Sequence, residues 1–139
     1  MRVRILIVLV NLVFGLLNTN AQCSNDLADK TYDRLADFTF LKEINVTADK
    51  KYKTKRYPLI FNKGSKYRFT ANTDNSSTKP LLNIYSQLGE LIASNYDPES
   101  ETTYDIFEYT ANQTGEYYAT LEFNGKATGC LIAMVGFVY

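Results

Sequence analysis

The chain has 139 residues, of which 15 are basic and 15 are acidic, so its formal net charge at pH 7 is zero. It contains no histidine, which excludes Ser-His-Asp and Cys-His catalytic sites and metal centres with histidine ligands. The balanced charge gives no general attraction to nucleic acid or to anionic membranes, so neither is expected as a partner.

Residues 1–21 have the three parts of a secretory signal peptide. Arg2 and Arg4 carry positive charge, residues 5–17 are mostly apolar, and small Ala21 precedes the expected cleavage point. The apolar run is shorter than the roughly 20 residues that span a bilayer as a helix. We therefore expect a secreted or periplasmic protein with no membrane span in its mature chain.

Cys23 and Cys130 are the two cysteines of the chain. In an exported protein, an isolated pair is expected to form one disulfide, which here would join the start of the mature chain to its last strand. Two alternatives stay open. Cys23 could carry the lipid of a lipoprotein, although residues 20–22 lack the usual Leu-x-small pattern, or both thiols could be free.

Residues 22–39 are expected to form a helical N-terminal segment. Within residues 24–38, Leu27, Leu35 and Phe38 recur at helical spacing, which places them on one face. This helix is expected to lie against a sheet, where the neighbouring cysteine would tie it down.

After the helix, the apolar spacing shortens to two, which is typical of strands. About eight strands are predicted, at residues 41–47, 57–61, 66–71, 81–85, 91–93, 104–110, 117–123 and 130–139. The last of them is apolar on both faces, as expected of a central strand that is covered on both sides. The pattern predicts an all-β sandwich or jelly roll, formed as a single domain over residues 22–139.

Three segments resemble the bacterial pre-peptidase C-terminal domain family. Residues 67–71 are similar to its first aromatic strand, residues 82–95 to its Leu-Tyr-Gly hairpin, and residues 114–118 to its Gly-x-Tyr-Tyr strand start. The resemblance implies a small secreted β-sandwich, and members of that family usually follow an exported peptidase. The N-terminal helix and the cysteine pair depart from the family pattern. The Ala21-Gln22 junction resembles those of exported Bacteroidetes proteins.

A basic run lies between the first two predicted strands, at Lys50, Lys51, Lys53, Lys55 and Arg56. Such a run could bind an anionic glycan, a lipid headgroup or an acidic partner. The alternative is an edge strand or loop on which lysines prevent edge-to-edge pairing.

Two loops are rich in oxygen-bearing side chains. The first contains Asn72, Asp74, Asn75 and Ser76, and the second contains Asp97, Glu99, Glu101 and Asp105. Calcium prefers six to eight oxygen ligands, so a calcium site at Asn72, Asp74, Asp97 or Glu99 is a hypothesis. Ordinary turn chemistry explains both loops as well. No other cofactor is expected.

Glu108, Glu116 and Glu122 are the acids that could supply a glycosidase pair. No pattern brings two of them together on one cleft, and a small domain offers little cleft. With histidine absent as well, we expect no enzyme activity.

Tyrosine is abundant, and six of the eleven tyrosines could form an exposed platform for sugar rings or a protein. They are Tyr85, Tyr96, Tyr104, Tyr109, Tyr118 and Tyr139, of which Tyr96 and Tyr118 join the basic run as candidate partner-binding residues. The alternative is ordinary packing, since strands are enriched in tyrosine.

These features predict a secreted, non-catalytic binding or structural module that contacts an extracytoplasmic protein or a cell-surface glycan. Two further functions stay open. One is a carbohydrate-binding module with a tyrosine platform, and the other is an adaptor or inhibitor of an exported peptidase.

Overall fold

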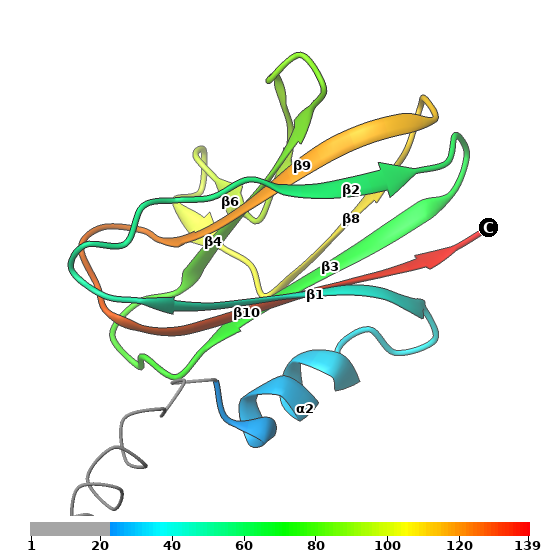
Figure 1. Cartoon of the computed structure of the whole chain (residues 1–139). Coiled ribbons are helices and arrows are strands. Elements are labelled where there is room, and N and C mark those ends of the chain that lie inside the picture. Colours follow the sequence, from blue (N-terminus) through cyan, green and yellow to red (C-terminus); the bar gives the residue numbers. More distant parts are fainter. Residues whose placement is uncertain (1–22) are drawn as a thin grey trace, which may run out of the picture.

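The structure is a computed structural model that describes residues 23–139, and the predicted signal peptide lies outside these residues. Two four-stranded antiparallel sheets face each other as a β-sandwich (Figure 1), which confirms the predicted fold class. No helix within the described residues is long and apolar enough to span a membrane.

Residues 23–139 form one helix and ten strands. The helix is α2 (Asn25–Asp33), and the strands are β1 (Thr39–Ala48), β2 (Tyr57–Phe61), β3 (Lys66–Thr73), β4 (Pro80–Ser86), β5 (Leu91–Ser94), β6 (Tyr96–Asp97), β7 (Thr102–Thr103), β8 (Ile106–Thr110), β9 (Gly115–Phe123) and β10 (Gly129–Val138). Sheet A has the order β1-β10-β3-β8 and sheet B the order β2-β9-β4-β5, while β6 and β7 pair as a separate small hairpin.

An aromatic cluster fills one part of the space between the sheets. Phe61 of sheet B is fully buried, and its ring stacks on Tyr67 of sheet A at 4.0 Å and on Tyr117 at 4.6 Å. Phe69 meets Phe61 edge-on at 6.0 Å. Aromatic rings of sheet A and sheet B therefore pack directly against each other here, and this contact joins the two layers.

Strand β10 is buried on both faces, as its composition predicts. Leu131, Ala133 and Val135 belong to the core between the sheets. The alternate residues Ile132 and Met134 belong to a second cluster beneath α2, which lies against the outer face of sheet A (Figure 1). The prediction that the N-terminal helix lies against a sheet is confirmed, and the strand that it covers is the last one.

The helix is shorter than the predicted range of 24–38. Ser24 caps its start by accepting a hydrogen bond from the Leu27 amide at 3.3 Å, and the helix ends at Asp33. Ala36 then has a φ of 53°, a left-handed conformation that stops a helix. Leu35 is nevertheless buried against the sheet, because the turn that follows α2 returns it to the same side.

The segment between the predicted strands at 91–93 and 104–110 contains the hairpin of β6 and β7, and β8 begins at Ile106 rather than at residue 104. Asn95 accounts for the hairpin and for the late start of β8. Its side chain is buried, accepts a hydrogen bond from the Leu82 amide at 2.8 Å, and donates to the carbonyls of Pro80 and Tyr104. These bonds hold together the two ends of the excursion, so the chain leaves sheet B, forms a hairpin and enters sheet A.

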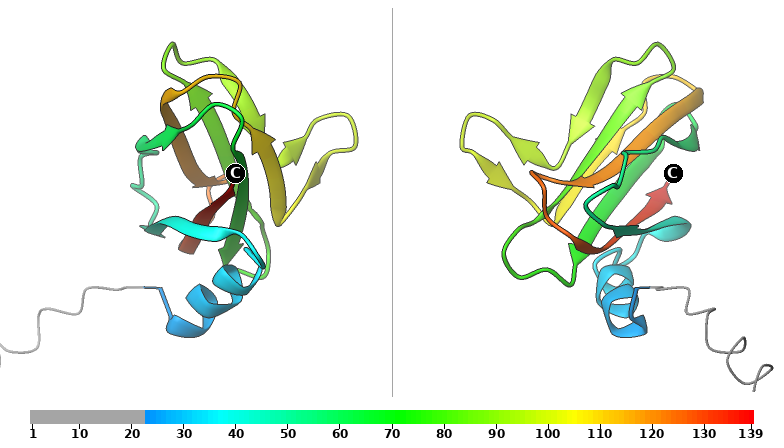
Figure 2. Two further views of the ribbon diagram at one scale, coloured as in Figure 1. Left: turned by 90° about the vertical axis from the view of Figure 1, so that its right-hand side faces the viewer. Right: turned by 60° about the vertical axis from the view of Figure 1, so that its left-hand side comes forward.

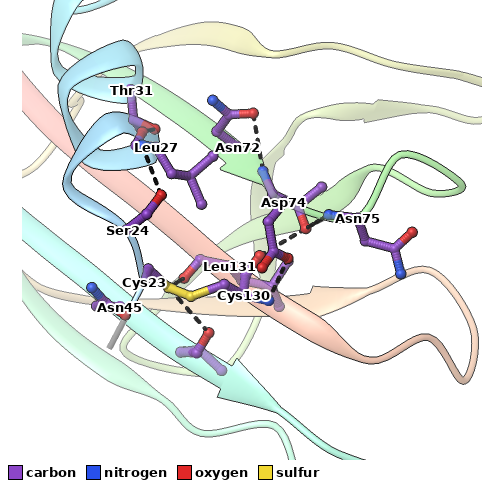
Figure 3. Close-up of a disulfide and its surroundings, with 12 residues drawn as sticks. Cys23, Ser24, Leu27, Thr31, Asn45, Asn72, Asp74, Asn75, Cys130 and Leu131 are labelled. Carbon is purple, nitrogen blue, oxygen red and sulfur yellow. Dashed lines mark hydrogen bonds between the residues drawn. A yellow bond between two sulfur atoms is a disulfide. The ribbon is translucent and has the colours of Figure 1, made fainter. Parts of the chain in front are cut away.

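The predicted disulfide is present between Cys23 and Cys130, whose Cα atoms are 5.5 Å apart (Figure 3). Both cysteines are buried. Asp74 lies beside the bridge and accepts a hydrogen bond from the Cys130 amide at 2.7 Å. The start of α2, the start of β10 and the end of β3 are thus joined at one corner.

Gly129 makes room for this arrangement, which leads to a testable prediction. A Cβ at Gly129 would lie 2.7 Å from Oδ1 of Asp74, and the φ of Gly129 is +141°. Gly129→Ala should displace the Asp74 carboxylate from the Cys130 amide and lose a charged hydrogen bond, which lowers the free energy of unfolding by about 1.5–3 kcal/mol. Urea unfolding at equilibrium measures this change in free energy.

Gly125→Ala is the matched control, because Gly125 also has a positive φ but has no atom within 4 Å of its Cβ position. Equal losses in the two variants would contradict the role given to Asp74.

Candidate functional site

The basic run lies in the loop between β1 and β2, which connects sheet A to sheet B. All five of its cations are exposed. Lys126, in the turn between β9 and β10, is also exposed, and this turn lies beside the basic loop in Figure 1. Among the described residues, none of these six cations has an ion pair. Their charge is therefore free to act on a ligand.

A cleft of about 550 Å³ opens between this loop and the β9–β10 turn. Lys50 lines it from the loop and Lys126 lines it from the turn. The other lining residues mix polar, acidic and apolar side chains and are Ala48, Asp49, Tyr52, Thr54, Glu122, Phe123, Gly125 and Ala127. We call this hollow the basic cleft.

The loop that forms the basic cleft is held in place by side chains. The Tyr52 hydroxyl donates to the Leu121 carbonyl at 2.9 Å, and the Thr54 hydroxyl donates to the Glu122 carboxylate. Burial of the Tyr52 hydroxyl raises its pKa to about 12, and the neighbouring Tyr57 adds to this shift. The phenol is neutral at physiological pH. The cleft is therefore bordered by an ordered loop.

The six candidate tyrosines do not form one platform. Tyr85 and Tyr118 lie opposite each other on β4 and β9, on the outer face of sheet B. The Arg56 guanidinium lies 6.0 Å from the Tyr118 ring centroid, and the Tyr118 hydroxyl donates to Glu116, which raises the pKa of Tyr118. Both rings are half-buried. Tyr85 and Tyr118 are the two candidate tyrosines that lie side by side, and their role in stacking on sugars stays a prediction.

The other four tyrosines are dispersed. Tyr109 lies near the Phe61 and Tyr117 rings of the core, and Tyr96 lies on β6. Tyr104 is exposed just before β8, and Tyr139 is exposed after β10. Their positions match the alternative of tyrosines packed separately in and around a sandwich.

The hairpin of β6 and β7 stands away from both sheets, as both views in Figure 2 show. The Asp97 carboxylate accepts hydrogen bonds from the Ser100 hydroxyl at 2.7 Å and from the Glu99 amide at 2.9 Å. These bonds hold the pKa of Asp97 below its usual value, so its charge helps to order the tip. Glu99 and Glu101 are exposed. We call residues 96–103 the acidic hairpin.

Three of the four side chains proposed for calcium accept hydrogen bonds from the protein, and Glu99 is exposed. Asn72 accepts from the Thr73 amide, Asp74 from the Cys130 amide, and Asp97 from its own turn. Among the described residues, no group of three or more Asp, Glu, Cys or His side chains is placed to hold a metal ion. Turn chemistry accounts for these oxygens, and calcium binding stays a prediction.

The three candidate catalytic acids are separated. Glu108 lies on sheet A, where Arg68 at 2.7 Å and Lys66 at 3.5 Å accompany it and the Arg68 hydrogen bond lowers the pKa of Glu108. Glu116 and Glu122 lie near opposite ends of β9 in sheet B. Each is engaged by a different hydroxyl. The arrangement provides no pair of carboxylates for acid–base hydrolysis.

Comparison with known proteins gives a structural likeness but no sequence match. No family model matches the chain, and no curated protein sequence matches it. The fold is similar to the crystal structure of Aeromonas hydrophila PliG, a periplasmic lysozyme inhibitor of g-type lysozyme. The TM-score is 0.51 and the sequence identity 15%, over 73% of this chain and 89% of that chain. At this identity the likeness establishes a shared β-sandwich fold.

Proposed function

We propose that this protein is an exported, non-catalytic inhibitor that binds a lysozyme through the acidic hairpin. The fold likeness to a periplasmic inhibitor of g-type lysozyme supports this choice of target. The Cys23–Cys130 disulfide supports an oxidising compartment, where such bonds persist. The observation that carries the proposal is the acidic hairpin itself.

An inhibitor must reach into the concave site of its enzyme, and the acidic hairpin has the required shape (Figure 2). The base and the tip of the acidic hairpin are both held by hydrogen bonds before any partner binds. Asn95 ties its base to β4, and Asp97 orders its tip through Glu99 and Ser100. A segment that is ordered in advance loses little conformational entropy when it binds, which favours affinity.

The charge of the acidic hairpin defines the surface that it fits. Glu99 and Glu101 are exposed and have no ion pair among the described residues. Opposite charges across an interface speed association and select the partner. The complementary surface on the target enzyme is therefore positively charged.

The protein is expected to inhibit cell-wall lysis by a g-type lysozyme, measured as the rate at which a bacterial suspension clears. Glu99→Lys/Glu101→Lys should raise the inhibitory concentration at least about tenfold, because two favourable charge contacts become repulsive. Glu43→Lys/Glu90→Lys makes the same change of charge on exposed sites elsewhere and should leave inhibition unchanged.

Two results would overturn the proposal. One is the absence of inhibition at micromolar protein against g-type and other lysozymes. The other is an equal loss in the control variant, which would point to net charge rather than to the hairpin. The resemblance to pre-peptidase C-terminal domains provides the alternative target, and inhibition of an exported peptidase in a parallel assay would favour it.

A further inference from the structure

We propose that the basic cleft binds a short segment of a carboxylated polysaccharide, a function separate from the proposed inhibition of a lysozyme. The acidic hairpin does not take part in it. The cleft lies between the β1–β2 loop and the β9–β10 turn, whereas the hairpin joins β5 to β8.

The first argument is the concentration of unpaired positive charge. Lys50 and Lys126 line the cleft from two segments that are far apart in the sequence. Lys51, Lys53, Lys55 and Arg56 lie on the same loop without lining the cleft, and no ion pair among the described residues neutralises any of these side chains. Because the chain as a whole is neutral, this end of the molecule attracts anions more strongly than the rest of its surface.

The second argument is the mixed lining, which distinguishes among anionic ligands. The carboxylates of Asp49 and Glu122 lie in the cleft with the two lysines. Asp49 accepts from the Lys51 amide and Glu122 from Thr54, and each carboxylate retains further lone pairs for a hydroxyl donor. A ligand that fits both the lysines and the carboxylates carries anionic groups that are spaced apart and many hydroxyl groups between them. A carboxylated glycan has this composition. Nucleic acid, with a phosphate at each nucleotide, would meet the two acids unfavourably.

The third argument is the shape of the surface. The cleft of about 550 Å³ is within the range of roughly 300–1,000 Å³ that is usual for sites that enclose small ligands. Tyr52 and Ala127, which are only partly buried, add apolar area on which a sugar ring can pack. A lipid bilayer is flat at this scale and would contact the exposed lysines of the loop without entering the cleft. The concave shape therefore favours a chain of sugars over a membrane.

The probe for the test is oligogalacturonate, a carboxylated sugar chain, with its methyl-esterified neutral form as the reference ligand. Isothermal titration calorimetry at low salt should detect binding of the acidic chain and none of the neutral chain. Binding should weaken as salt rises, because exposed charges are screened. Vesicles rich in phosphatidylglycerol are run in parallel.

Two matched variants separate the cleft from the general charge of the loop. Lys50→Gln/Lys126→Gln removes the two lysines that line the cleft, and Lys51→Gln/Lys53→Gln removes two lysines of the same loop that do not. The first should weaken binding at least about tenfold, since charge-assisted hydrogen bonds are lost. The second should weaken it by a few-fold at most. Circular dichroism should show that both variants are folded, because all four side chains are exposed.

The proposal is overturned if the acidic chain does not bind, if the neutral chain binds equally, or if the two variants lose affinity to the same extent. Binding to anionic vesicles that exceeds binding to the acidic chain would also overturn it and would assign the lysines to a membrane surface.

Discussion

Cys23→Ala/Cys130→Ala is expected to lower the free energy of unfolding by about 4–5 kcal/mol. The disulfide closes a loop with a sequence separation of 107 residues, and the entropy that such a link removes from the unfolded chain is of this size. Domains of this kind have stabilities of about 5–15 kcal/mol, so a large share would be lost. Urea unfolding followed by circular dichroism measures the change.

Reduction of the unaltered protein provides the control. Dithiothreitol should shift its unfolding midpoint to that of the double variant and should leave the variant itself unchanged. Hydrogen exchange should quicken first in α2, which the bridge connects to β10. If the reduced and oxidised proteins unfold at the same urea concentration, the bridge contributes no stability and the account of this corner of the fold is wrong.

Phe61→Ala is expected to cost about 3–5 kcal/mol, the usual loss when a buried aromatic side chain leaves a cavity. The Phe61 ring is fully buried and lies 4.0 Å from the Tyr67 ring and 4.6 Å from the Tyr117 ring. Its removal therefore opens a gap where sheet A meets sheet B. The measurement is again urea unfolding.

Ile60 supplies the matched control for Phe61, since it is the preceding residue on β2 and its side chain is 60% exposed. Ile60→Ala should change the unfolding free energy by about 0.5 kcal/mol or less, as is usual at surface positions. A loss at Phe61 no greater than that at Ile60 would show that the aromatic cluster does not join the two sheets.

Alternation of apolar residues was enough to predict most strands of the sandwich. Strand β2 has the predicted bounds, and β10 is covered on both faces, as its composition indicates. The end of α2 could not be read in this way, because the apolar spacing continues through Leu35 while the backbone turns at Ala36. The β6–β7 hairpin was missed because strands of two residues are too short to show a period.

The candidate sites were predicted in part. The basic run was visible as a sequence of lysines, but the cleft depends on Lys126, which folding brings from another turn. The pairing of Tyr85 with Tyr118 depends on the register of β4 and β9, which no local pattern reveals. The use of Asp97 to order a projecting hairpin likewise became visible only with the fold.

The proposal that the acidic hairpin binds a lysozyme is tested most directly by hydrogen exchange of the protein with and without a g-type lysozyme. Contact at an interface slows exchange of the amides that it covers. We predict that amide protection rises at residues 96–103 and is unchanged in β1, the edge strand of sheet A. Protection confined to another surface, or no change at any amide at saturating enzyme, would contradict the account.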